Sequence, residues 1–275
     1  MTDNPLAPPG DDSAARDFLR YLAVDWSIPG GNLLHTVAVA FSRLPYENLT
    51  KIIKEAEFGR SAQARRGPRE VFSDHVALGT GGTCFSLTAA FLYLVRTLGY
   101  QAEPILADRR YGKNTHCALL VWIDGRPHLL DPGYLIVDPI ALPDAEKRLQ
   151  TAFNELVLVP AADLGRMELH TIEGNGRKHR LTYKLRPVGA PEFCRTWDES
   201  FGWDMMRYPL LTRTQQGKQL YMRGNHLQVR TLEAVERREI APGRLAAQIA
   251  SEFGIAPSVA ARALSILTGK GERLG

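Results

Sequence analysis

Cysteine is scarce in this 275-residue sequence. It occurs at positions 84, 117 and 194, and none of these cysteines belongs to a C-x-x-C pair. An odd number of cysteines without such spacing argues against a disulfide framework and against a zinc site made of cysteines. The seven histidines also lack the short spacing of metal ligands, so we predict no metal site. Free cysteines suit a reducing compartment.

Long apolar runs are missing as well, and no stretch is long enough to cross a membrane. Residues 1–17 are polar and acidic rather than basic and then apolar, so we expect no signal peptide and a cytoplasmic protein.

A formal net charge of +4, with dispersed basic residues, argues against nucleic acid or membrane partners. The basic segment 60–69 is interpreted as a solvated surface loop. A phosphate-binding G-x-x-x-x-G-K-[ST] loop is absent.

The most informative stretch that is present is GTGGTCFS, residues 79–86. Its three glycines allow the backbone to turn sharply. The apolar run that follows ends at Gly99, as is typical of a helix buried on most sides. Cys84 is therefore predicted at a helix N-terminus, where unpaired N–H groups and the helix dipole lower the pKa of a thiol. The alternative is a structural cysteine, because free cysteine is among the most buried residue types.

A second feature lies about thirty residues downstream. The dipeptide Asp124-Gly125 separates two strand-like segments, 115–123 and 126–131, and is a strong signal for a two-residue type I′ hairpin turn. The register of that turn places His116 on the same face as Asp131, as diagonal neighbours about 7–8 Å apart and within side-chain reach. The alternatives are a core histidine bonded to a backbone carbonyl and an aspartate that caps a turn.

Together these residues suggest a catalytic triad. Cys84 would be the nucleophile, His116 would take its proton, and Asp131 would orient the histidine, which is the logic of covalent catalysis. Cys117 is expected to point to the opposite face of its strand.

The same residues resemble the signatures of the arylamine N-acetyltransferase family. The resemblance rests on GGTCF at 81–85, TH at 115–116 and DPGY at 131–134. In addition, LPYENL at 44–49 is similar to the family's N-terminal Pro-Phe-Glu-Asn-Leu element, and EFGI at 252–255 matches near the C-terminus. The ordered set covers most of the chain.

This resemblance implies an α+β fold. A helical domain at 1–98 would carry Cys84, a central antiparallel β-barrel at 99–205 would carry His116 and Asp131, and an α/β lid would follow at 206–275. The patterning agrees, since successive strand-like segments without helices between them favour antiparallel sheet. Those segments are 101–108, 115–123, 126–131, 150–160, 166–173, 178–186, 208–214, 219–223 and 226–232. Helix-like segments are 13–24, 33–43, the end of 47–56, 85–98, 244–253 and 257–268.

The resemblance also implies ping-pong acyl transfer. Cys84 would take an acetyl group from acetyl-CoA, which is a cosubstrate, and no cofactor would stay bound. The acceptor would be an aromatic amine, a hydroxylamine or a hydrazine. Tyr46, Phe85 and Tyr134 are the candidate substrate-binding residues, with ordinary core packing as the alternative for the two tyrosines.

Two other activities use the same three catalytic residues. Relatives of the family act as amide synthases, which release an acyl chain from an acyl carrier protein onto an aromatic amine. A third reading is a transglutaminase-like cysteine hydrolase, or a binding module that keeps the fold without turnover.

The chain departs from the family pattern at several positions. Thr80 stands where the family commonly has an arginine, so Glu47 is expected to lack its partner. Ser86 and Thr88 replace a glutamate and an asparagine. Leu135 replaces a glycine and is expected to crowd the mouth where coenzyme A enters.

Overall fold

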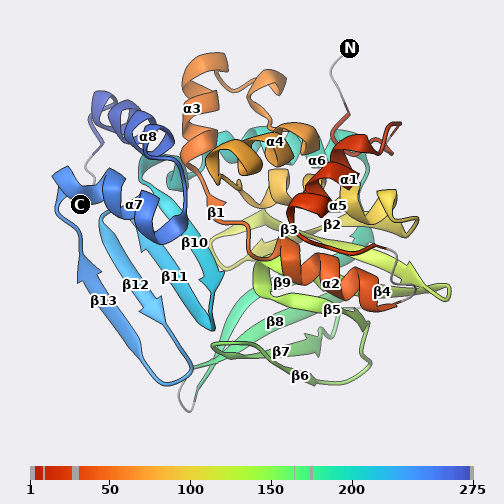
Figure 1. The fold of residues 1–275 in the computed structure, drawn as a ribbon. Coiled ribbons are helices and arrows are strands. Elements are labelled where there is room, and N and C mark those ends of the chain that lie inside the picture. The colour runs from red at the N-terminus through yellow and green to blue at the C-terminus, as the bar shows by residue number, and fades with distance from the viewer. Residues whose placement is uncertain (1–3, 9, 27–30, 164, 174–175, 273–275) are drawn as a thin grey trace.

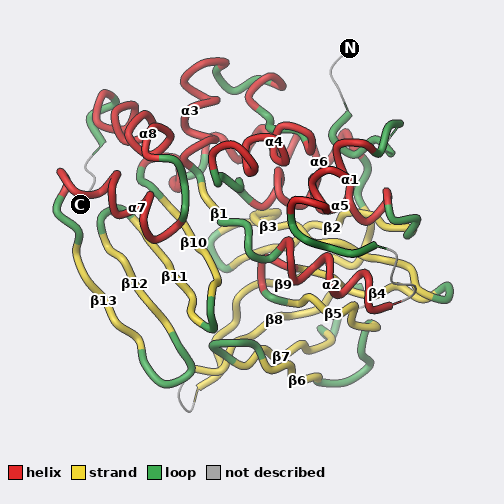
Figure 2. The backbone as a smooth tube through the Cα atoms, in the orientation of Figure 1, coloured by secondary structure: helices red, strands yellow, loops and turns green. Residues whose placement is uncertain are grey.

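The computed structural model describes residues 4–8, 10–26, 31–163, 165–173 and 176–272. The first three residues of the acidic N-terminal segment therefore lie outside the described ranges. Most of the helices lie above two sheets, whereas α2 (Gly31–Phe41) lies in front of the larger sheet (Figures 1 and 2). Within the described ranges, every helix is too short or too polar to span a bilayer.

The first third of the chain is helical, as predicted. Its helices are α1 (Ser13–Tyr21), α2 (Gly31–Phe41), α3 (Leu49–Phe58), α4 (Pro68–Leu78) and α5 (Cys84–Thr97). Helix α5 is buried on almost every side because its sequence is apolar all round. Helix α4 has no counterpart among the predicted segments. It begins at Pro68, since a proline is tolerated at the first helical position, so its first two residues fall within the segment 60–69 that was interpreted as a loop.

The central part is an antiparallel sheet curled into a half-barrel, in the order β5-β4-β3-β2-β9-β8-β7-β6. Its strands are β2 (Gln101–Arg109), β3 (Gly112–Ile123), β4 (Arg126–Asp131), β5 (Ile136–Ala141), β6 (Lys147–Gln150), β7 (Glu155–Pro160), β8 (Arg166–Glu173) and β9 (Gly176–Pro187). Two differences from prediction stand out: β5 was not expected, and the segment 150–160 belongs to two strands that pair with each other. The α+β class with a curled antiparallel sheet is confirmed.

The C-terminal part is a second sheet covered by two helices. Its strands are β1 (Tyr46–Glu47), β10 (Leu210–Gln215), β11 (Lys218–Arg223), β12 (His226–Arg230) and β13 (Val235–Glu239). Helices α7 (Leu245–Phe253) and α8 (Pro257–Gly269) pack on the sheet face that carries Leu211 and Met222, and all of these elements share one core. The opposite face is polar and points into the cavity described below.

Strand β1 was not predicted, and it ties the helical part to this second sheet. Tyr46 pairs with Thr212 of β10, and it also forms a bridge with Gly82 in the loop before α5. A segment near residue 46 thus completes a sheet whose other strands come from the last quarter of the chain. The domain boundaries at 98/99 and 205/206 stay a prediction.

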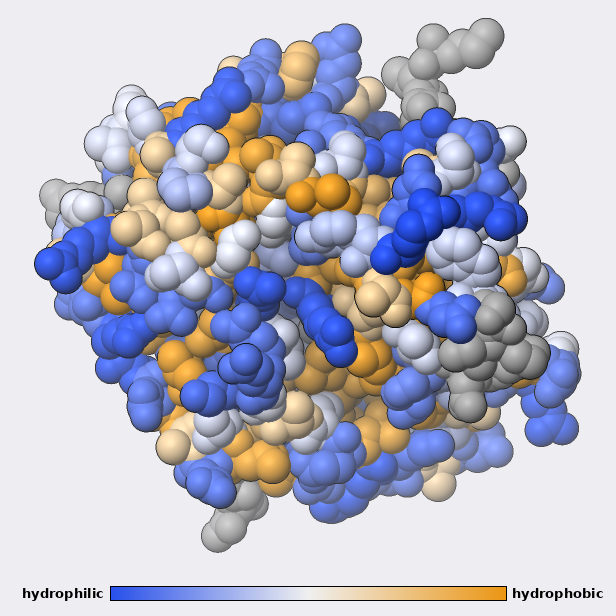
Figure 3. All heavy atoms as spheres, in the orientation of Figure 1, coloured by the Kyte–Doolittle hydropathy of each residue, from blue (hydrophilic) through white to orange (hydrophobic). Residues whose placement is uncertain are grey.

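Helix α6 (Ala190–Glu199) was also not predicted, and it packs against the N-terminal part of α5. Phe193 and Trp197 on α6 pack against Phe85, with ring centroids 5.2 and 6.1 Å apart. Short 3₁₀ helices occur at Ala62–Ala64, Pro132–Tyr134, Ser200–Gly202, Asp204–Arg207 and Pro242–Arg244. Hydrophilic side chains cover most of the face seen in Figure 3, while the apolar residues gather in three buried clusters.

Candidate active site

The loop that precedes Cys84 is held by a close backbone approach. A Cβ atom on Gly81 would lie 1.8 Å from the carbonyl oxygen of Pro45, so a residue with a side chain does not fit there. The Glu47 N–H donates to the Gly82 carbonyl at 3.0 Å, which continues the same contact. Gly81 is therefore required by the passage of the 45–47 segment, whereas a Cβ atom on Gly79 would meet the carbonyl oxygen of Gly254 at 2.0 Å.

Arg66 takes the place of the arginine that the sequence lacks at Thr80. Its Nη1 donates to the Gly81 carbonyl at 2.7 Å, and its Nη2 pairs with Asp74 at 2.7 Å. The same guanidinium lies 3.6 Å from the Glu47 carboxylate. The expectation that Glu47 has no arginine partner is therefore wrong. The solvated-loop interpretation of 60–69 is wrong at this residue too, because Arg66 is only 4% exposed.

The hairpin that carries the other two triad residues has the predicted register. Strand β3 pairs with β4 from Ile123 opposite Arg126 to Leu119 opposite Leu130. Asp124 and Gly125 have φ angles of 50° and 74°, as a type I′ turn requires.

This register brings His116 and Asp131 together. His116 Nε2 donates to Asp131 Oδ2 at 2.6 Å, and both side chains are buried. Asp131 Oδ2 also accepts from the Tyr183 hydroxyl at 2.8 Å, and its Oδ1 accepts from the Gly133 N–H at 3.1 Å. The carboxylate is thus held on both oxygens, and the Nδ1 atom of His116 is left to face the cavity.

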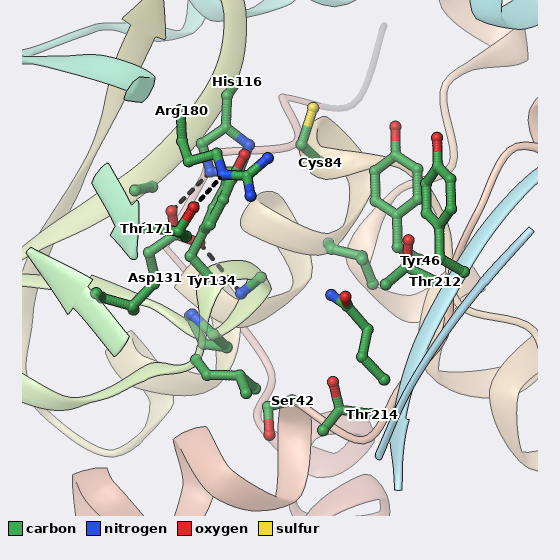
Figure 4. A pocket seen from close by; sticks show the side chains of 18 of the residues that line it. Ser42, Tyr46, Cys84, His116, Asp131, Tyr134, Thr171, Arg180, Thr212 and Thr214 are labelled. Carbon is green, nitrogen blue, oxygen red and sulfur yellow. Dashed lines mark hydrogen bonds and ion pairs between the residues drawn. The ribbon is translucent and has the colours of Figure 1, made fainter. Parts of the chain in front are cut away.

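Cys84 is the first residue of α5 and is 6% exposed. Its Sγ lies 4.0 Å from the Thr115 carbonyl oxygen, beside His116 on β3 (Figure 4). A hydrogen bond from the Cys117 thiol, followed by contacts with His116 and Arg109, holds the pKa of Cys84 well below its ordinary value despite burial. Burial alone would lower the pKa of His116, but the Asp131 carboxylate outweighs it and raises that pKa to about 9. The sulfur is therefore suited to be a thiolate beside a protonated imidazole.

Cys117 belongs to the helical core, as expected for a residue on the other face of β3 from His116. Its Sγ contacts the Thr88 hydroxyl at 3.2 Å, one turn along α5 from Cys84. Burial raises the pKa of the Cys117 thiol, so it stays protonated and is suited to donate to the Thr88 hydroxyl.

A cavity of about 990 Å³ opens between the half-barrel and the second sheet, and the triad lines it. Tyr46 and Tyr134 lie on different sides of this cavity, and Thr212 and Thr214 of β10 face it (Figure 4). Phe85 does not line the cavity, since it is fully buried in the aromatic cluster behind α5. We therefore leave Phe85 out of the substrate site.

The cavity is rich in positive charge. Among the described lining residues, Asp131 is the one carboxylate. The cationic lining residues are Arg109, Arg110, Arg177, Lys178, Arg180, Arg213, Arg230 and Arg237. Such a lining favours anionic ligands, and phosphate groups in particular.

The structure shows the contacts of the three residues Ser86, Thr88 and Leu135, which depart from the family pattern. The Ser86 hydroxyl donates to the Thr83 carbonyl at 3.0 Å, inside the first turn of α5. The Thr88 hydroxyl bonds the backbone of Cys117 at 3.2 Å. Leu135 lines the cavity in a left-handed conformation, with φ at 59°.

Three polar residues of the site were missed from the sequence: Arg66, Arg109 and Tyr183. Arg66 could have been inferred, because a buried Glu47 needs a cationic partner and a basic segment lies nearby in the sequence. No local pattern in the sequence indicated Arg109 or Tyr183. Among the described residues, no group of three His, Cys, Asp or Glu side chains gathers in a way that could hold a metal ion.

Comparison with known proteins supports the resemblance noted from the sequence. A family profile described as N-acetyltransferase matches residues 32–261. Proansamycin X synthase of Amycolatopsis mediterranei is 30% identical over 174 residues, which span 60% of this chain and 61% of that protein. The arylamine N-acetyltransferase of Mycobacterium abscessus superposes with a TM-score of 0.79 at 16% identity, covering 95% of this chain and 99% of that one. The Mycobacterium marinum enzyme in complex with CoA gives 0.75 at 15% identity, covering 94% and 98%. On the family match and this shared fold, the chain belongs to the arylamine N-acetyltransferase family.

Proposed function

We propose that this protein transfers an acyl group from a thioester to an aromatic amine through an acyl-cysteine on Cys84. The observation that carries the proposal is the position of the Cys84 sulfur, at a helix N-terminus beside the His116–Asp131 pair and inside a large cavity. Membership in a family of acyltransferases supports it.

In the first half-reaction, the Cys84 thiolate attacks the carbonyl carbon of the donor thioester. Negative charge develops on the carbonyl oxygen, and backbone N–H groups at the start of α5 are placed to stabilise it. The carbon–sulfur bond of the donor then breaks, and protonated His116 donates its proton to the departing thiolate. The product is an acyl-cysteine with a neutral His116.

In the second half-reaction, the amine nitrogen attacks the acyl carbon, and His116 Nδ1 accepts the amine proton. The Cys84–acyl bond then breaks, Cys84 leaves as a thiolate, and His116 keeps the amine proton, so the thiolate–imidazolium pair forms again. Asp131 keeps the Nε2 proton of the ring in place throughout, because it is itself fixed by Tyr183 and Gly133.

Acetyl-CoA is the simplest donor under this proposal. The solved structure of the Mycobacterium marinum relative contains CoA, and the basic lining of the cavity suits phosphate groups. Tyr46 and Tyr134 supply aromatic surface for an aromatic amine acceptor, with hydroxylamines and hydrazines as further acceptors of the same chemistry.

A second candidate is an amide synthase that releases a carrier-bound acyl chain onto an aromatic amine. The observation that favours it is the similarity to proansamycin X synthase. The cavity volume of about 990 Å³ and the polar sheet face along it suit a chain longer than acetyl. Leu135, which lines the cavity, supports a donor other than free acetyl-CoA.

Intact-mass spectrometry after a single turnover tests the proposal. The protein is incubated with a panel of acyl-CoAs and with acyl groups on a phosphopantetheinylated carrier protein, and Cys84→Ala is the control. We expect a mass increase of one acyl group in the parent protein, mapped to Cys84, and none in the variant. The donor that reacts fastest distinguishes the two candidates. Absence of an adduct with every donor would contradict acyl transfer.

A further inference from the structure

Helix α3 buries a lysine in its first turn. Lys51 is only 5% exposed, although lysine is almost never buried to this extent without a charged partner. The side chain is absent from the cavity lining, so its ammonium group lies in the protein interior rather than in the site described above. A buried titratable group of this kind is a candidate for a functional role.

Aromatic rings and a hydroxyl group surround the ammonium group. Its Nζ atom lies 4.5 Å from the centroid of the Phe201 ring and 5.6 Å from that of the Trp203 ring. It donates a hydrogen bond to the Ser200 hydroxyl, which donates in turn to the Trp197 carbonyl. Within the described part of the chain, no carboxylate forms an ion pair with Lys51. Ring faces attract the cation, but they do not neutralise it.

Two carboxylates act on Lys51 from a greater distance, and both have partners of their own. Glu55, one turn further along α3, accepts a hydrogen bond from Lys270 at 3.0 Å. Asp198 on α6 accepts one from Arg65 at 2.6 Å. The charge of Lys51 is therefore left largely uncompensated by carboxylates.

The charge of Lys51 is linked to that of the nucleophile. Burial lowers the pKa of Lys51 to about 8, and the negative charge of Cys84 is the largest of the effects that oppose this, ahead of Glu55, Asp198 and Cys117. At neutral pH the side chain thus remains mostly protonated. Such a coupling is mutual, so the ammonium group favours the Cys84 thiolate as much as the thiolate favours the ammonium group.

The path from Lys51 to Cys84 runs through the aromatic cluster behind α5. The Trp203 ring, which Lys51 contacts, lies 6.0 Å from the Phe85 ring, and Phe85 directly follows Cys84 in the first turn of the helix. Packed rings offer little screening. At an effective dielectric constant of about 20, a unit charge about 10 Å away changes an ionisation equilibrium by about tenfold.

We propose that Lys51 is a positioning residue for the nucleophile, a buried cation that stabilises the Cys84 thiolate from behind α5 while His116 does so from the cavity. The inference rests on the proposed function, since it assigns a support to the nucleophile of that reaction. In the second half-reaction the same cation favours departure of Cys84 as a thiolate. No bond forms or breaks at Lys51, and it keeps its proton throughout.

The stability of a Lys51→Met variant distinguishes this role from a purely structural one. Burying a cation without a carboxylate costs free energy, and methionine fills a similar volume without a charge. We therefore expect the urea midpoint of Lys51→Met to stay unchanged or to rise. A lysine that served only to hold the fold would lower it when removed.

The alkylation rate of Cys84 as a function of pH is the decisive measurement. Iodoacetamide rates are followed from pH 5 to 10, and mass spectrometry locates the label. Below pH 7, Lys51→Met should slow the reaction by about tenfold, as expected for the loss of a nearby unit charge. Above about pH 9 the rates should converge, because Lys51 is then neutral in the parent protein as well. Lys51→Gln should behave like Lys51→Met, whereas Lys51→Arg should recover part of the rate.

Lys54→Met is the matched control on the same helix. The Lys54 ammonium group also lies over an aromatic ring, 4.8 Å from the centroid of Phe58, but it pairs with Glu70 at 2.8 Å. Its removal should leave the alkylation profile of Cys84 unchanged. A shift as large as that of Lys51→Met would show that any lysine of α3 has this effect, and the assignment would fail.

Alkylation needs no acyl donor, so this test is independent of acyl transfer. If the parent protein forms no acyl adduct but the rates diverge below pH 7 as expected, the role of Lys51 stands and the proposed function fails. If the acyl adduct forms while Lys51→Met leaves the alkylation profile unchanged, or slows alkylation equally at every pH, the assignment of Lys51 is overturned. A lower urea midpoint with an unchanged profile would overturn it too.

Discussion

The Arg66 guanidinium donates to the Gly81 carbonyl at 2.7 Å and thereby connects α4 to the loop that starts the nucleophile helix. It is buried and also pairs with Asp74 and approaches Glu47, so one side chain joins three segments behind Cys84. This relationship explains how the loop keeps its shape although position 80 is a threonine.

Arg66→Met should therefore destabilise the protein strongly. Removing one partner of a buried ion pair leaves charge without compensation and costs about 3–5 kcal/mol. Urea unfolding measures the loss. Arg69→Met is the control, because Arg69 pairs with Asp11 and both side chains are more than half exposed, so its loss should destabilise the protein far less. Equal losses for the two variants would show that Arg66 has no special part in the loop.

Selective alkylation should identify Cys84 as the reactive thiol. Its lowered pKa provides thiolate well below the normal thiol pKa of about 8.5, whereas burial raises the pKa of both Cys117 and Cys194. Iodoacetamide rates are followed from pH 5 to 9, and mass spectrometry locates the label. His116→Ala should remove most of the advantage of Cys84. Similar labelling of all three cysteines would mean that the triad is not assembled.

The rate of acylation should fall as the pH rises through about 9. His116 must be protonated to donate to the departing thiolate, and its pKa is raised to about 9 in the folded protein. The pH dependence of single-turnover acylation, measured by rapid quench, reports this group. A rate that keeps rising to pH 10 would show that His116 is not the acid in this step.

The same shift has a consequence for stability. Since the pKa of folded His116 lies above the ordinary value of 6.5, its protonated form stabilises the fold fully below that value. This contribution is lost as the pH rises toward 9. Asp131→Asn removes the partner, so the urea midpoint of this variant should depend less on pH over that range.

In the Asp131→Asn variant we also expect turnover to drop by about 10⁴-fold, because an amide favours the wrong imidazole tautomer.

Leu135→Gly should preserve or raise stability and also open the cavity. A left-handed conformation costs a residue with a side chain about 1–2 kcal/mol, and glycine adopts it freely. Because Leu135 lines the cavity, its loss should also lower the KM for acetyl-CoA. Thermal unfolding and steady-state kinetics check the two effects. A higher KM would indicate that Leu135 contacts the donor rather than obstructs it.

The placement of Cys84, His116 and Asp131 could be predicted from the sequence because their positions depend on local rules. The Asp124-Gly125 turn sets the register of its own strands, and that register brings His116 to Asp131. In the same way, the glycines and the apolar run are enough to put Cys84 at the start of a helix. Turn geometry and hydrophobic periodicity act over a few residues, so they can be recognised without the fold.

The rest of the site was decided by tertiary structure. Arg66 reaches Gly81 from the loop before α4, Tyr183 reaches Asp131 from β9, and the bulge in β2 turns Arg109 into the cavity. The pairing of β1 with β10 joins residues more than 160 positions apart. Contacts of this kind depend on which elements lie side by side after folding, and no spacing in the chain records that. The sequence by itself determined the local positions of Cys84, His116 and Asp131, whereas only the packing of distant segments decided which residues hold and surround them.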